Sequence, residues 1–301
     1  MSFARITVVG LGLIGSSVAH AVRARLPEAR VTGYDGDPEV RRVASEIGLC
    51  DTIADDAAAA AREAELVVLC VPVGAMGAAA SEMAGALPVE AIVTDVGSCK
   101  GSVVEALQTA LPGRTIVPAH PVAGTEQSGP TAGFATLFNH RWCILTPPEG
   151  TDAAAVERVA NFWRALGAEV ETMAPDHHDR VLAVTSHLPH LIAYTIVGTA
   201  SDLEEVTQSE VIKFSAGGFR DFTRIAASDP TMWRDVFLAN REAVLDMLQR
   251  FSEDLALLQR AIRWGQGDAL FDHFTQTRAI RRSIVEQGQD DARADFGRAH
   301  E

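Results

Sequence analysis

A histidine and a serine follow two strand-like runs in the first half of the chain, where they could do chemistry together. Ser98 lies in DVGSCKG at residues 95–101, and His120 lies in PAHPVAGTEQSG at residues 118–129. Histidine has an ordinary pKa of about 6.5, so His120 could accept a proton near neutral pH. A serine hydroxyl could hydrogen-bond two reacting partners without adding charge. Taken alone, His120 could equally be structural, and Ser98 could be a helix N-cap.

A glycine-rich turn near the N-terminus has the spacing of a dinucleotide-binding loop. VGLGLIG at residues 9–15 follows a predicted strand and begins a predicted helix. The first glycine permits the tight turn, the second allows the backbone to approach a pyrophosphate, and the third allows close packing of helix and strand. The helix start adds N–H donors and positive potential. We therefore expect these residues to bind the nucleotide: Gly10, Gly12, Leu13, Ile14 and Gly15.

An acidic residue at the end of the second predicted strand indicates which nucleotide is bound. Asp35 comes 20 residues after Gly15, where a carboxylate accepts hydrogen bonds from the adenosine ribose and repels a 2′-phosphate. NAD is therefore expected rather than NADP. Arg41 and Arg42 could reach a phosphate, but we interpret them as the solvated face of the next helix. Val71 and Pro72 end the third strand and should line the adenosine side.

The elements that carry these residues alternate between strand and helix patterns. Strands are predicted at residues 6–10, 30–34, 66–71, 91–95 and 115–119, and two more at 141–146 and 168–173, with a helix over 152–166 between the last two. This alternation predicts an α/β Rossmann domain, a doubly wound parallel sheet with helices on both faces, over residues 1–173. His120 then lies at the carboxyl end of the fifth strand.

Residues 174–301 show only helix patterns and predict an all-α C-terminal domain. One helix should run from about Asp176 to Val197, kinked at Pro189. Asp229 and Pro230 should begin a long helix with an apolar seam. The segment 264–268 should be a turn, and the residues after 287 a polar tail. The seam either packs within one subunit or joins two subunits in a homodimer; its members are Val244, Leu248, Phe251, Leu255, Leu258 and Ile262.

Charge and composition exclude several classes of partner. The chain has 301 residues, of which 47% are hydrophobic, and a formal net charge of -14. Such an acidic protein is not expected to bind nucleic acid or an anionic membrane. The four cysteines show no CxxC pair, which favours a reducing cytoplasm. The apolar start after Arg5 resembles a secretory signal, but glycines interrupt it, and no stretch offers 18 uninterrupted apolar residues.

Cations and rings in the second half could bind an anionic substrate. Arg220 and Arg224 lie four residues apart in GGFRDFTRIA, which predicts one helical face, although either could be a surface ion-pair partner. His187 and His190 lie in SHLPH, and their spacing could also indicate a metal site. We expect no metal, because there is no HExxH and the adjacent histidines at 177–178 point in different directions on a helix.

Taken together, GSCKG, AHPVAGTEQSG, SHLPH, GGFRDFTRIA and SDPTMWRD resemble the prephenate dehydrogenase family, which includes arogenate and cyclohexadienyl dehydrogenases. The resemblance implies oxidative decarboxylation of a cyclohexadienyl substrate, with NAD as hydride acceptor and an aromatic product. Matching positions imply that His120 accepts the substrate's hydroxyl proton and that Ser98 orients this hydroxyl and the nicotinamide. They also imply substrate contacts from Arg224 with a carboxylate and His190 with the side chain, from His187 supporting His190, from Trp233 closing the pocket, and from Thr125.

Two other functions and one specificity remain open at the sequence level. A β-hydroxyacid dehydrogenase of the 6-phosphogluconate type would place a lysine on the early helix of the second half, where histidines stand instead. A nucleotide-sensing regulator would need neither Ser98 nor His120. The side chain accepted could be the keto form (prephenate), the amino form (arogenate), or both. No pattern of an added regulatory module follows residue 268, so feedback by tyrosine would act at or near the active site.

Overall fold

The computed structural model describes residues 3–125, 127–202 and 217–286. Contacts divide the chain into two units, residues 1–244 and residues 245–301. The boundary that the sequence predicts at 173/174 stays a prediction. The predicted polar tail after residue 287 lies outside the described residues.

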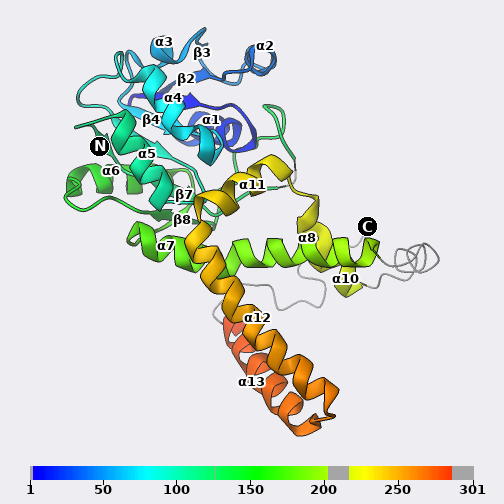
Figure 1. The fold of residues 1–301 in the computed structure, drawn as a ribbon. Helices are drawn as coiled ribbons and strands as arrows, with labels where there is room; N and C mark the ends of the chain where they lie inside the picture. Colours follow the sequence, from blue (N-terminus) through cyan, green and yellow to red (C-terminus); the bar gives the residue numbers. More distant parts are fainter. Residues whose placement is uncertain (1–2, 126, 203–216, 287–301) are drawn as a thin grey trace. The chain divides into compact units, whose positions relative to one another are not determined.

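A parallel sheet forms the centre of the first unit (Figure 1). Its strands stand in the order β3-β2-β1-β4-β5-β6. Their bounds are β1 Arg5–Val9, β2 Arg30–Tyr34, β3 Thr52–Ile53, β4 Leu66–Leu69, β5 Ile92–Asp95 and β6 Thr115–Ile116. The order reverses between β1 and β4, and ligands bind beyond the carboxyl ends of strands at such a reversal. The predicted Rossmann sheet is confirmed, whereas β3 was not predicted because two residues carry no strand pattern.

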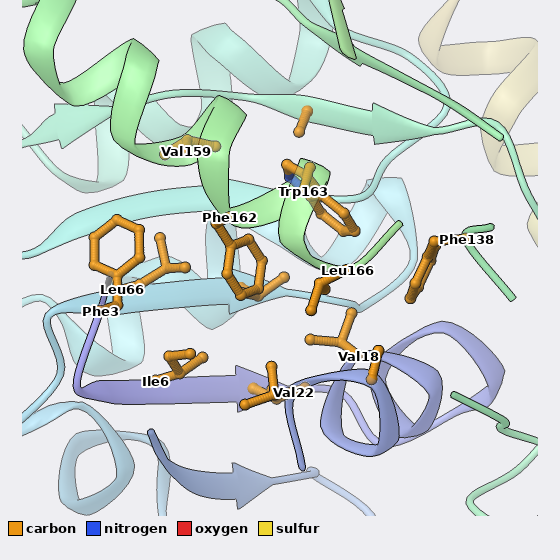
Figure 2. Packing of buried hydrophobic residues seen from close by; sticks show 14 of the residues in the cluster. Phe3, Ile6, Val18, Val22, Leu66, Phe138, Val159, Phe162, Trp163 and Leu166 are labelled. Atoms are coloured by element: carbon orange, nitrogen blue, oxygen red, sulfur yellow. The ribbon is translucent and has the colours of Figure 1, made fainter. Parts of the chain in front are cut away.

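Helices cover both faces of this sheet because successive strand side chains point to opposite faces. One core contains Val68 of β4 with residues of α1 (Leu13–Arg25) and α6 (Ala153–Ala165), and Figure 2 shows its packing around Trp163. The other core contains Val67, the neighbour of Val68, with residues of α3, α4 and α5. The remaining helical bounds are α2 Pro38–Glu46, α3 Ala57–Ala61, η1 Val73–Ala75, α4 Met76–Met83 and α5 Gly101–Ala110.

The chain changes sheets at Pro118, which corrects one predicted strand. The run expected as a single strand at 115–119 is β6 in the large sheet, followed by β7 (Ala119–Pro121) in a second sheet. Val117 still donates to Val93, but Pro118 has no N–H to continue that ladder, and its carbonyl accepts instead from Thr146. The second sheet has the order β7-β8-β9, with β8 at Trp142–Leu145 and β9 at Glu169–Thr172. His120 therefore lies within β7, not after the fifth strand.

A helical run with a wide turn follows the second sheet. It consists of α7 (Pro175–Leu182), a π-helical turn η2 (Ala183–His187) and α8 (Leu188–Ser201). The kink predicted at Pro189 stays a prediction, and the structure has a π turn just before the proline. A proline here cannot donate to the carbonyl of Thr185, and its ring would clash with that carbonyl in a regular α-helix.

The run Pro175–Ser201 is long and apolar enough, by length and composition alone, to cross a membrane, and it is the one such helix among the described residues. It also carries polar side chains that are buried inside the first unit, namely His178, Asp179 and His187. Helices in the core of a folded domain share this length and apolar composition.

Three short helices follow in the described part of the first unit, before α12. They are α10 (Gly217–Thr223), the 3-10 helix η3 (Arg224–Ala227) and α11 (Pro230–Ala239). Asp229 caps α11 as predicted, since its carboxylate accepts from the backbone N–H of Met232 at 2.7 Å. The long helix expected to continue from there is interrupted at Asn240, after which α12 (Arg241–Arg263) begins. The side chain of Asn240 bonds to other elements, as described below, which explains the interruption.

The second unit contains most of α12 and all of α13 (Gly267–Glu286), joined by the predicted turn. Apolar side chains on both helices and in the turn between them are exposed: Leu255 is 52% exposed, Leu257 64%, Ile262 67%, Trp264 in the turn 71% and Phe271 70%. Leu255 and Ile262 belong to the predicted seam, whereas Val244, at the end of the first unit, is buried.

Candidate active site

The glycine loop has the geometry that a bound pyrophosphate needs. Gly10 has φ +92°, and a Cβ there would lie 2.5 Å from the carbonyl oxygen of Cys70. A Cβ on Gly15 would lie 1.9 Å from the carbonyl oxygen of Gly10. A Cβ on Gly12, in contrast, would meet nothing within 4 Å. Space is thus open beside Gly12 at the start of α1, where Leu13 and Ile14 form the first helical turn and its N–H groups attract anions.

The carboxylate of Asp35 lies beside this loop. Its oxygens accept hydrogen bonds from the backbone N–H of Leu11 at 2.8 Å and of Asp37 at 2.9 Å. Arg41 donates to the carbonyl oxygen of Asp35 at 2.6 Å. The fixed negative charge therefore sits at the end of β2, at the carboxyl edge of the sheet.

The other residues predicted near the adenosine are placed as follows. Arg42 forms ion pairs with Glu39 and Glu46 on the exposed face of α2, as predicted for a solvated helix face. Val71 and Pro72 come after β4 and Cys70. Val71 lies against Gly10, since its Cγ1 would be 3.0 Å from a Cβ built on that glycine.

A buried ion pair fixes the loop that carries Ser98. Lys100 and Asp95 have no exposed side-chain surface, and the ammonium of Lys100 lies 2.5 Å from the carboxylate. The same ammonium donates to the carbonyl oxygen of Ala119 at 2.7 Å, so it ties this loop to β7 next to His120. Ser98 is half-buried in the loop. It does not cap α5, because the N-cap position is Lys100.

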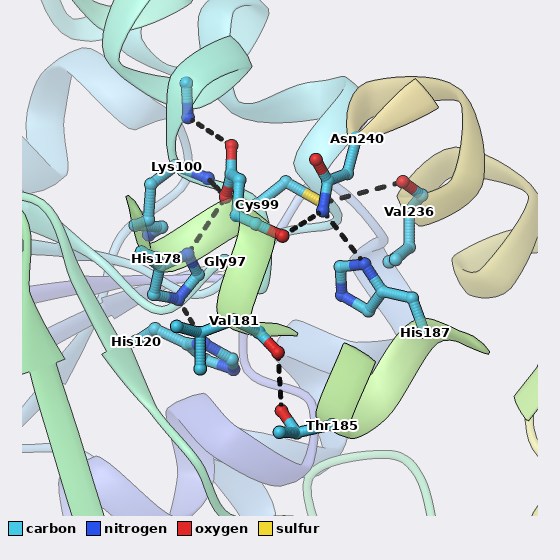
Figure 3. Close-up of polar contacts among 12 residues, drawn as sticks. Gly97, Cys99, Lys100, His120, His178, Val181, Thr185, His187, Val236 and Asn240 are labelled. Atoms are coloured by element: carbon cyan, nitrogen blue, oxygen red, sulfur yellow. Dashed lines mark hydrogen bonds and ion pairs between the residues drawn. The ribbon is translucent and has the colours of Figure 1, made fainter. Parts of the chain in front are cut away.

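His120 is buried and contacts a histidine that the sequence reasoning did not select. Its Nδ1 lies 2.9 Å from Nε2 of His178, whose Nδ1 lies 2.9 Å from a carboxylate oxygen of Asp179 (Figure 3). Asp179 accepts two backbone hydrogen bonds at the start of α5, from Lys100 at 2.7 Å and Gly101 at 2.8 Å. The structure thus joins β7, α7 and α5 through one continuous chain of hydrogen bonds.

Burial and neighbours shift the pKa values in this chain. Burial lowers the pKa of His120 well below its usual value, and the nearby His178, Lys100 and His187 lower it further. Burial also lowers the pKa of His178, against the effect of Asp179. For Asp179, burial raises the pKa, but the hydrogen bonds from His178 and the backbone outweigh it, and the pKa is lowered. Near neutral pH the two histidines are neutral and Asp179 is charged.

His187 is held by Asn240 and does not contact His190 by a hydrogen bond. The amide of Asn240 donates to the carbonyl oxygen of Asp179 at 2.8 Å and lies 3.1 Å from Nδ1 of His187. Burial lowers the pKa of His187 to about 4, so the ring is neutral and accepts this bond at Nδ1. The ring of His187 meets Trp233 edge-on, with centroids 6.0 Å apart. Since His190 stacks on the same Trp233, the predicted support of His190 by His187 stays a prediction.

His190 and Trp233 form a stacked pair, which brings two predicted residues together. Their ring centroids are 3.7 Å apart at 24°. Nδ1 of His190 donates to the carbonyl oxygen of Ser186 at 2.8 Å, which directs Nε2 away from the helix axis as the open nitrogen. Trp233 is 7% exposed, and its indole Nε1 is buried without a hydrogen-bond partner.

The predicted arginine pair is separated by the end of a helix. Arg220 lies in α10, whereas Arg224 begins η3, so the two are not on one face of a single helix. The reason is that α10 ends at Thr223. Burial lowers the pKa of His190, the bond to Ser186 opposes this, and the positive charge of Arg224 lowers it further. Arg224 therefore lies within electrostatic reach of His190.

Thr125 is exposed in the loop after β7, where its hydroxyl accepts from the N–H of Gln127 at 3.2 Å. The structure does not bring it into hydrogen-bond contact with the other predicted residues.

The histidines of the second half could also bind a metal ion, as their spacing in the sequence suggests. Within the described residues, no group of three or more histidine, cysteine or acidic side chains is arranged to hold a metal ion. Nδ1 of His187 and of His190 are both taken by the hydrogen bonds above.

A surface cavity of about 620 Å³ lies elsewhere, among Arg5, Glu65 and Arg158. It is at the amino ends of β1 and β4, the opposite edge from the glycine loop, and charges of both signs line it. Since ligands of such sheets bind at the carboxyl ends, we do not assign the active site to this cavity.

His178, Asp179 and Asn240 are the residues that sequence reasoning missed. DHHD at 176–179 was interpreted as the start of a helix, and Asp176 does lie in the first turn of α7. The one signal in the sequence was spacing, since His178 and Asp179 lie four and three residues before the apolar Leu182. This spacing does not show burial, whereas the structure buries all three side chains and exposes His177.

Comparison with known protein families gives two matches. A model described as "Prephenate dehydrogenase, nucleotide-binding domain" matches residues 18–172, and one described as "Prephenate dehydrogenase, dimerization domain" matches residues 174–276. Together they span most of the chain, including every element of the site after the glycine loop.

Individual relatives agree. A cyclohexadienyl dehydrogenase of Zymomonas mobilis is 46% identical, over 94% of this chain and 96% of its own length. The crystal structure of prephenate dehydrogenase from Aquifex aeolicus, with hydroxyphenyl propionate and NAD+, has TM-score 0.88 and 35% identity, covering 94% of this chain and 99% of that one. An arogenate dehydrogenase structure from Synechocystis has TM-score 0.80 and 27% identity, covering 93% and 99%.

Proposed function

The chain belongs to the prephenate dehydrogenase family, and we propose on this premise that it oxidatively decarboxylates prephenate, arogenate or both in tyrosine biosynthesis. The single observation that carries the proposal is the position of His120. This buried, neutral histidine lies beside the loop of Ser98, which begins at the carboxyl end of β5, the same edge of the sheet as the glycine loop. A proton acceptor is thus present where a bound nucleotide could accept hydride.

The proposed reaction has three coupled changes at the substrate ring. The hydroxyl O–H bond breaks and its proton goes to His120. The C–H bond on the ring carbon that bears this hydroxyl also breaks, and its hydrogen leaves as hydride with both electrons. NAD, when bound, supplies the acceptor for that hydride. The bond to the ring carboxylate breaks, carbon dioxide leaves, and its electron pair completes the aromatic ring. The ring oxygen is left as a phenolate and takes the proton back from His120. The products are 4-hydroxyphenylpyruvate from prephenate or tyrosine from arogenate.

The remaining predicted residues would bind and orient the substrate. Ser98, half-buried near His120, would hydrogen-bond the reacting hydroxyl. Arg224 would pair with a substrate carboxylate, which an acidic protein can hold only with a local cation. His190, stacked on Trp233, would contact the substrate side chain through Nε2. His187 would support Trp233 from behind, and Thr125 would lie in the loop over the site.

The nucleotide preference is proposed from the fold around Asp35. We propose that NAD is favoured over NADP, since a 2′-phosphate would meet the carboxylate of Asp35, which two backbone N–H groups fix in place. Arg41, which donates to the carbonyl oxygen of Asp35, is a cation that could oppose this preference.

The assembly and location follow from the family and the composition. We propose a homodimer formed through the helical domain, supported by the dimerization-domain match and by the exposed apolar side chains of α12 and α13. The domains would be residues 1–173 for the nucleotide and 174–301 for substrate and dimer contacts. A cytoplasmic location without nucleic-acid or membrane partners fits the charge of -14. The 6-phosphogluconate type of enzyme is not favoured, since the chain belongs to another family.

The His120→Asn variant tests the proposal. Asparagine removes the proton acceptor but keeps a polar group, so kcat should fall by about a hundredfold or more, while KM for the accepted substrate changes little. Steady-state assays would follow NADH formation with prephenate and with arogenate, each with NAD and with NADP. Near-normal turnover of the variant would refute the role of His120. Equal use of the two nucleotides by the unaltered protein would refute the role of Asp35.

A further inference from the structure

We propose that His178 and Asp179 are positioning residues that fix the tautomer of His120, so that its proton stays on Nδ1 and Nε2 remains free to accept a proton. The geometry that carries this is the chain of contacts from His120 to His178 to Asp179. The inference rests on the proposed function for its consequence, because it assumes that His120 is the proton acceptor. The tautomer itself can be measured without any substrate.

The first step concerns Asp179. Its two oxygens accept from the backbone N–H groups of Lys100 and Gly101, at the start of α5, where the helix dipole favours negative charge. Its pKa is lowered although burial opposes this. A carboxylate with no proton can only accept hydrogen bonds. Asp179 therefore requires a proton on Nδ1 of His178, 2.9 Å away.

The second step transfers this requirement to His120. Burial keeps His178 neutral, so a ring with its proton on Nδ1 has a bare Nε2 that can only accept. That Nε2 lies 2.9 Å from Nδ1 of His120, which must then donate. Neutral His120 has one ring proton, and it is on Nδ1. Nε2 of His120 is the nitrogen left with a lone pair.

The third step is the consequence for proton transfer. When the substrate O–H bond breaks, a new N–H bond forms at Nε2 of His120, and the ring becomes positively charged. Its Nδ1–H continues to donate to His178, behind which the charge of Asp179 lies, as in other histidines held by a carboxylate. No electron passes through the chain, since the hydride leaves from the substrate carbon.

The surroundings of His120 oppose its protonation, which makes this support necessary. Burial lowers the pKa of His120 most, and the neighbouring His178, Lys100 and His187 lower it further. Without an acceptor at Nδ1, the proton could move to Nε2, and the ring would lose its ability to act as a base. Replacing His178 should therefore lower kcat and leave substrate binding nearly unchanged.

The tautomer is tested by NMR of the protein labelled with ¹⁵N-histidine, without substrate. The signal of His120 is identified by its loss in His120→Asn. We expect Nδ1 of His120 to have the shift of a protonated nitrogen and Nε2 that of an unprotonated one near neutral pH. A proton on Nε2 of His120 in the unaltered protein would overturn the proposal, whatever the enzyme's activity.

Kinetics of two variants test the effect on turnover. His178→Leu removes the acceptor, and we expect kcat to fall by about ten- to a hundredfold with KM within about twofold, the scale seen when the partner of a functional histidine is removed. In His178→Gln the amide oxygen can take the place of Nε2 and accept from His120, so most of kcat should return. The exposed neighbour His177 provides the matched control, His177→Leu, with unchanged kcat.

The outcomes separate the two proposals. Equal losses in the Leu and Gln variants, or no loss in either, would overturn the positioning role of His178. Full activity of His120→Asn would overturn the proposed base and not the measured tautomer. If the Leu variant does not fold, the NMR spectrum of the unaltered protein still tests the tautomer of His120, and the kcat of the Gln variant still tests the positioning role of His178.

Discussion

Lys100 and Asp95 form a buried ion pair, so the charge of each depends on the other for its stability. Lys100 is fully buried, and its charge is balanced by Asp95 at 2.5 Å and by the carbonyl oxygen of Ala119. Removing one member of a buried pair leaves the other charge uncompensated, which costs about 3–5 kcal/mol. We therefore expect Lys100→Met to lower the free energy of unfolding by this amount, measured by urea denaturation.

An exposed pair serves as the control for that variant. Arg42 and Glu39 pair on the surface of α2, so Arg42→Ala should cost less than about 1 kcal/mol. Similar losses in the two variants would show that burial does not determine the strength of the first pair.

His187 makes stability depend on pH. Its pKa is about 4 in the folded chain, lowered mainly by burial, and 6.5 is the ordinary value. As pH falls from 6.5 towards 4, the unfolded chain takes up a proton that the folded chain does not, so stability present above pH 6.5 is lost. The loss of unfolding free energy from this one side chain is at most about 3 kcal/mol.

The dependence can be isolated by comparing unfolding free energies at pH 7.5, 5.5 and 4.5. The unaltered protein should lose more stability on acidification than His187→Gln, which has no titrating ring at this position. His120 and His178 remain in both proteins, so their shared contribution cancels. Parallel pH profiles would contradict the assignment.

At this scale, the sequence pointed to the residues proposed to react but not to the side chains that hold them. Ser98 and His120 could be selected because their types and their place after strands suit proton transfer. His178 and Asp179 could not, because a polar residue on a helix is normally exposed, and only the arrival of α5 and β7 around α7 buries them. Arg224 was selected, but the end of α10 at Thr223 was not foreseen.

Two variants of the glycine loop between β1 and α1 separate its role in folding from its role in nucleotide binding. Gly15→Ala would push a Cβ into the carbonyl oxygen of Gly10, so it should destabilise the fold itself. Gly12→Ala meets no protein atom within 4 Å, so it should leave the unfolding free energy nearly unchanged. Its methyl group would occupy the space expected for the pyrophosphate and weaken NAD binding by about tenfold or more.

Calorimetry of NAD binding and thermal unfolding of both variants distinguish these effects. A Gly12→Ala protein that binds NAD normally would show that the open space is not the nucleotide site.

Strands and helices of the first half were largely predictable, since buried parallel strands and amphipathic helices leave distinct patterns. The failures have local causes. The predicted strand at 115–119 is divided because Pro118 cannot donate to the ladder. The helix predicted beyond Asp229 stops at Asn240, whose side chain bonds to Asp179 and His187, contacts that no local pattern reveals.

At the scale of the whole molecule, the exposed apolar residues of the second unit predict self-association. Phe271 on α13 is 70% exposed, and replacing an apolar residue buried in an interface by a charge commonly costs well over 1.4 kcal/mol. Phe271→Asp should therefore raise the concentration at which the dimer dissociates by about tenfold or more. Sedimentation velocity over a dilution series measures this.

Val89→Asp is the matched control, since Val89 is 74% exposed but belongs to the first unit. It should dissociate as the unaltered protein does. A Phe271→Asp protein with unchanged association would contradict a dimer contact at α13. The sequence indicated the apolar seam of α12 but not Phe271 on α13. For the seam, periodicity alone left open whether it packs within a subunit or between two.

The π turn between α7 and α8 determines how far the side chains after it are rotated about the helix axis relative to those before it. His178 precedes the turn and contacts His120, whereas His190 follows it and stacks on Trp233. Each residue of an α-helix advances the rotation by about 100°. Loss of a single residue from the turn would rotate His190 by that angle relative to His178. Homologous sequences should therefore vary in residue type across 183–186 far more readily than they vary in length.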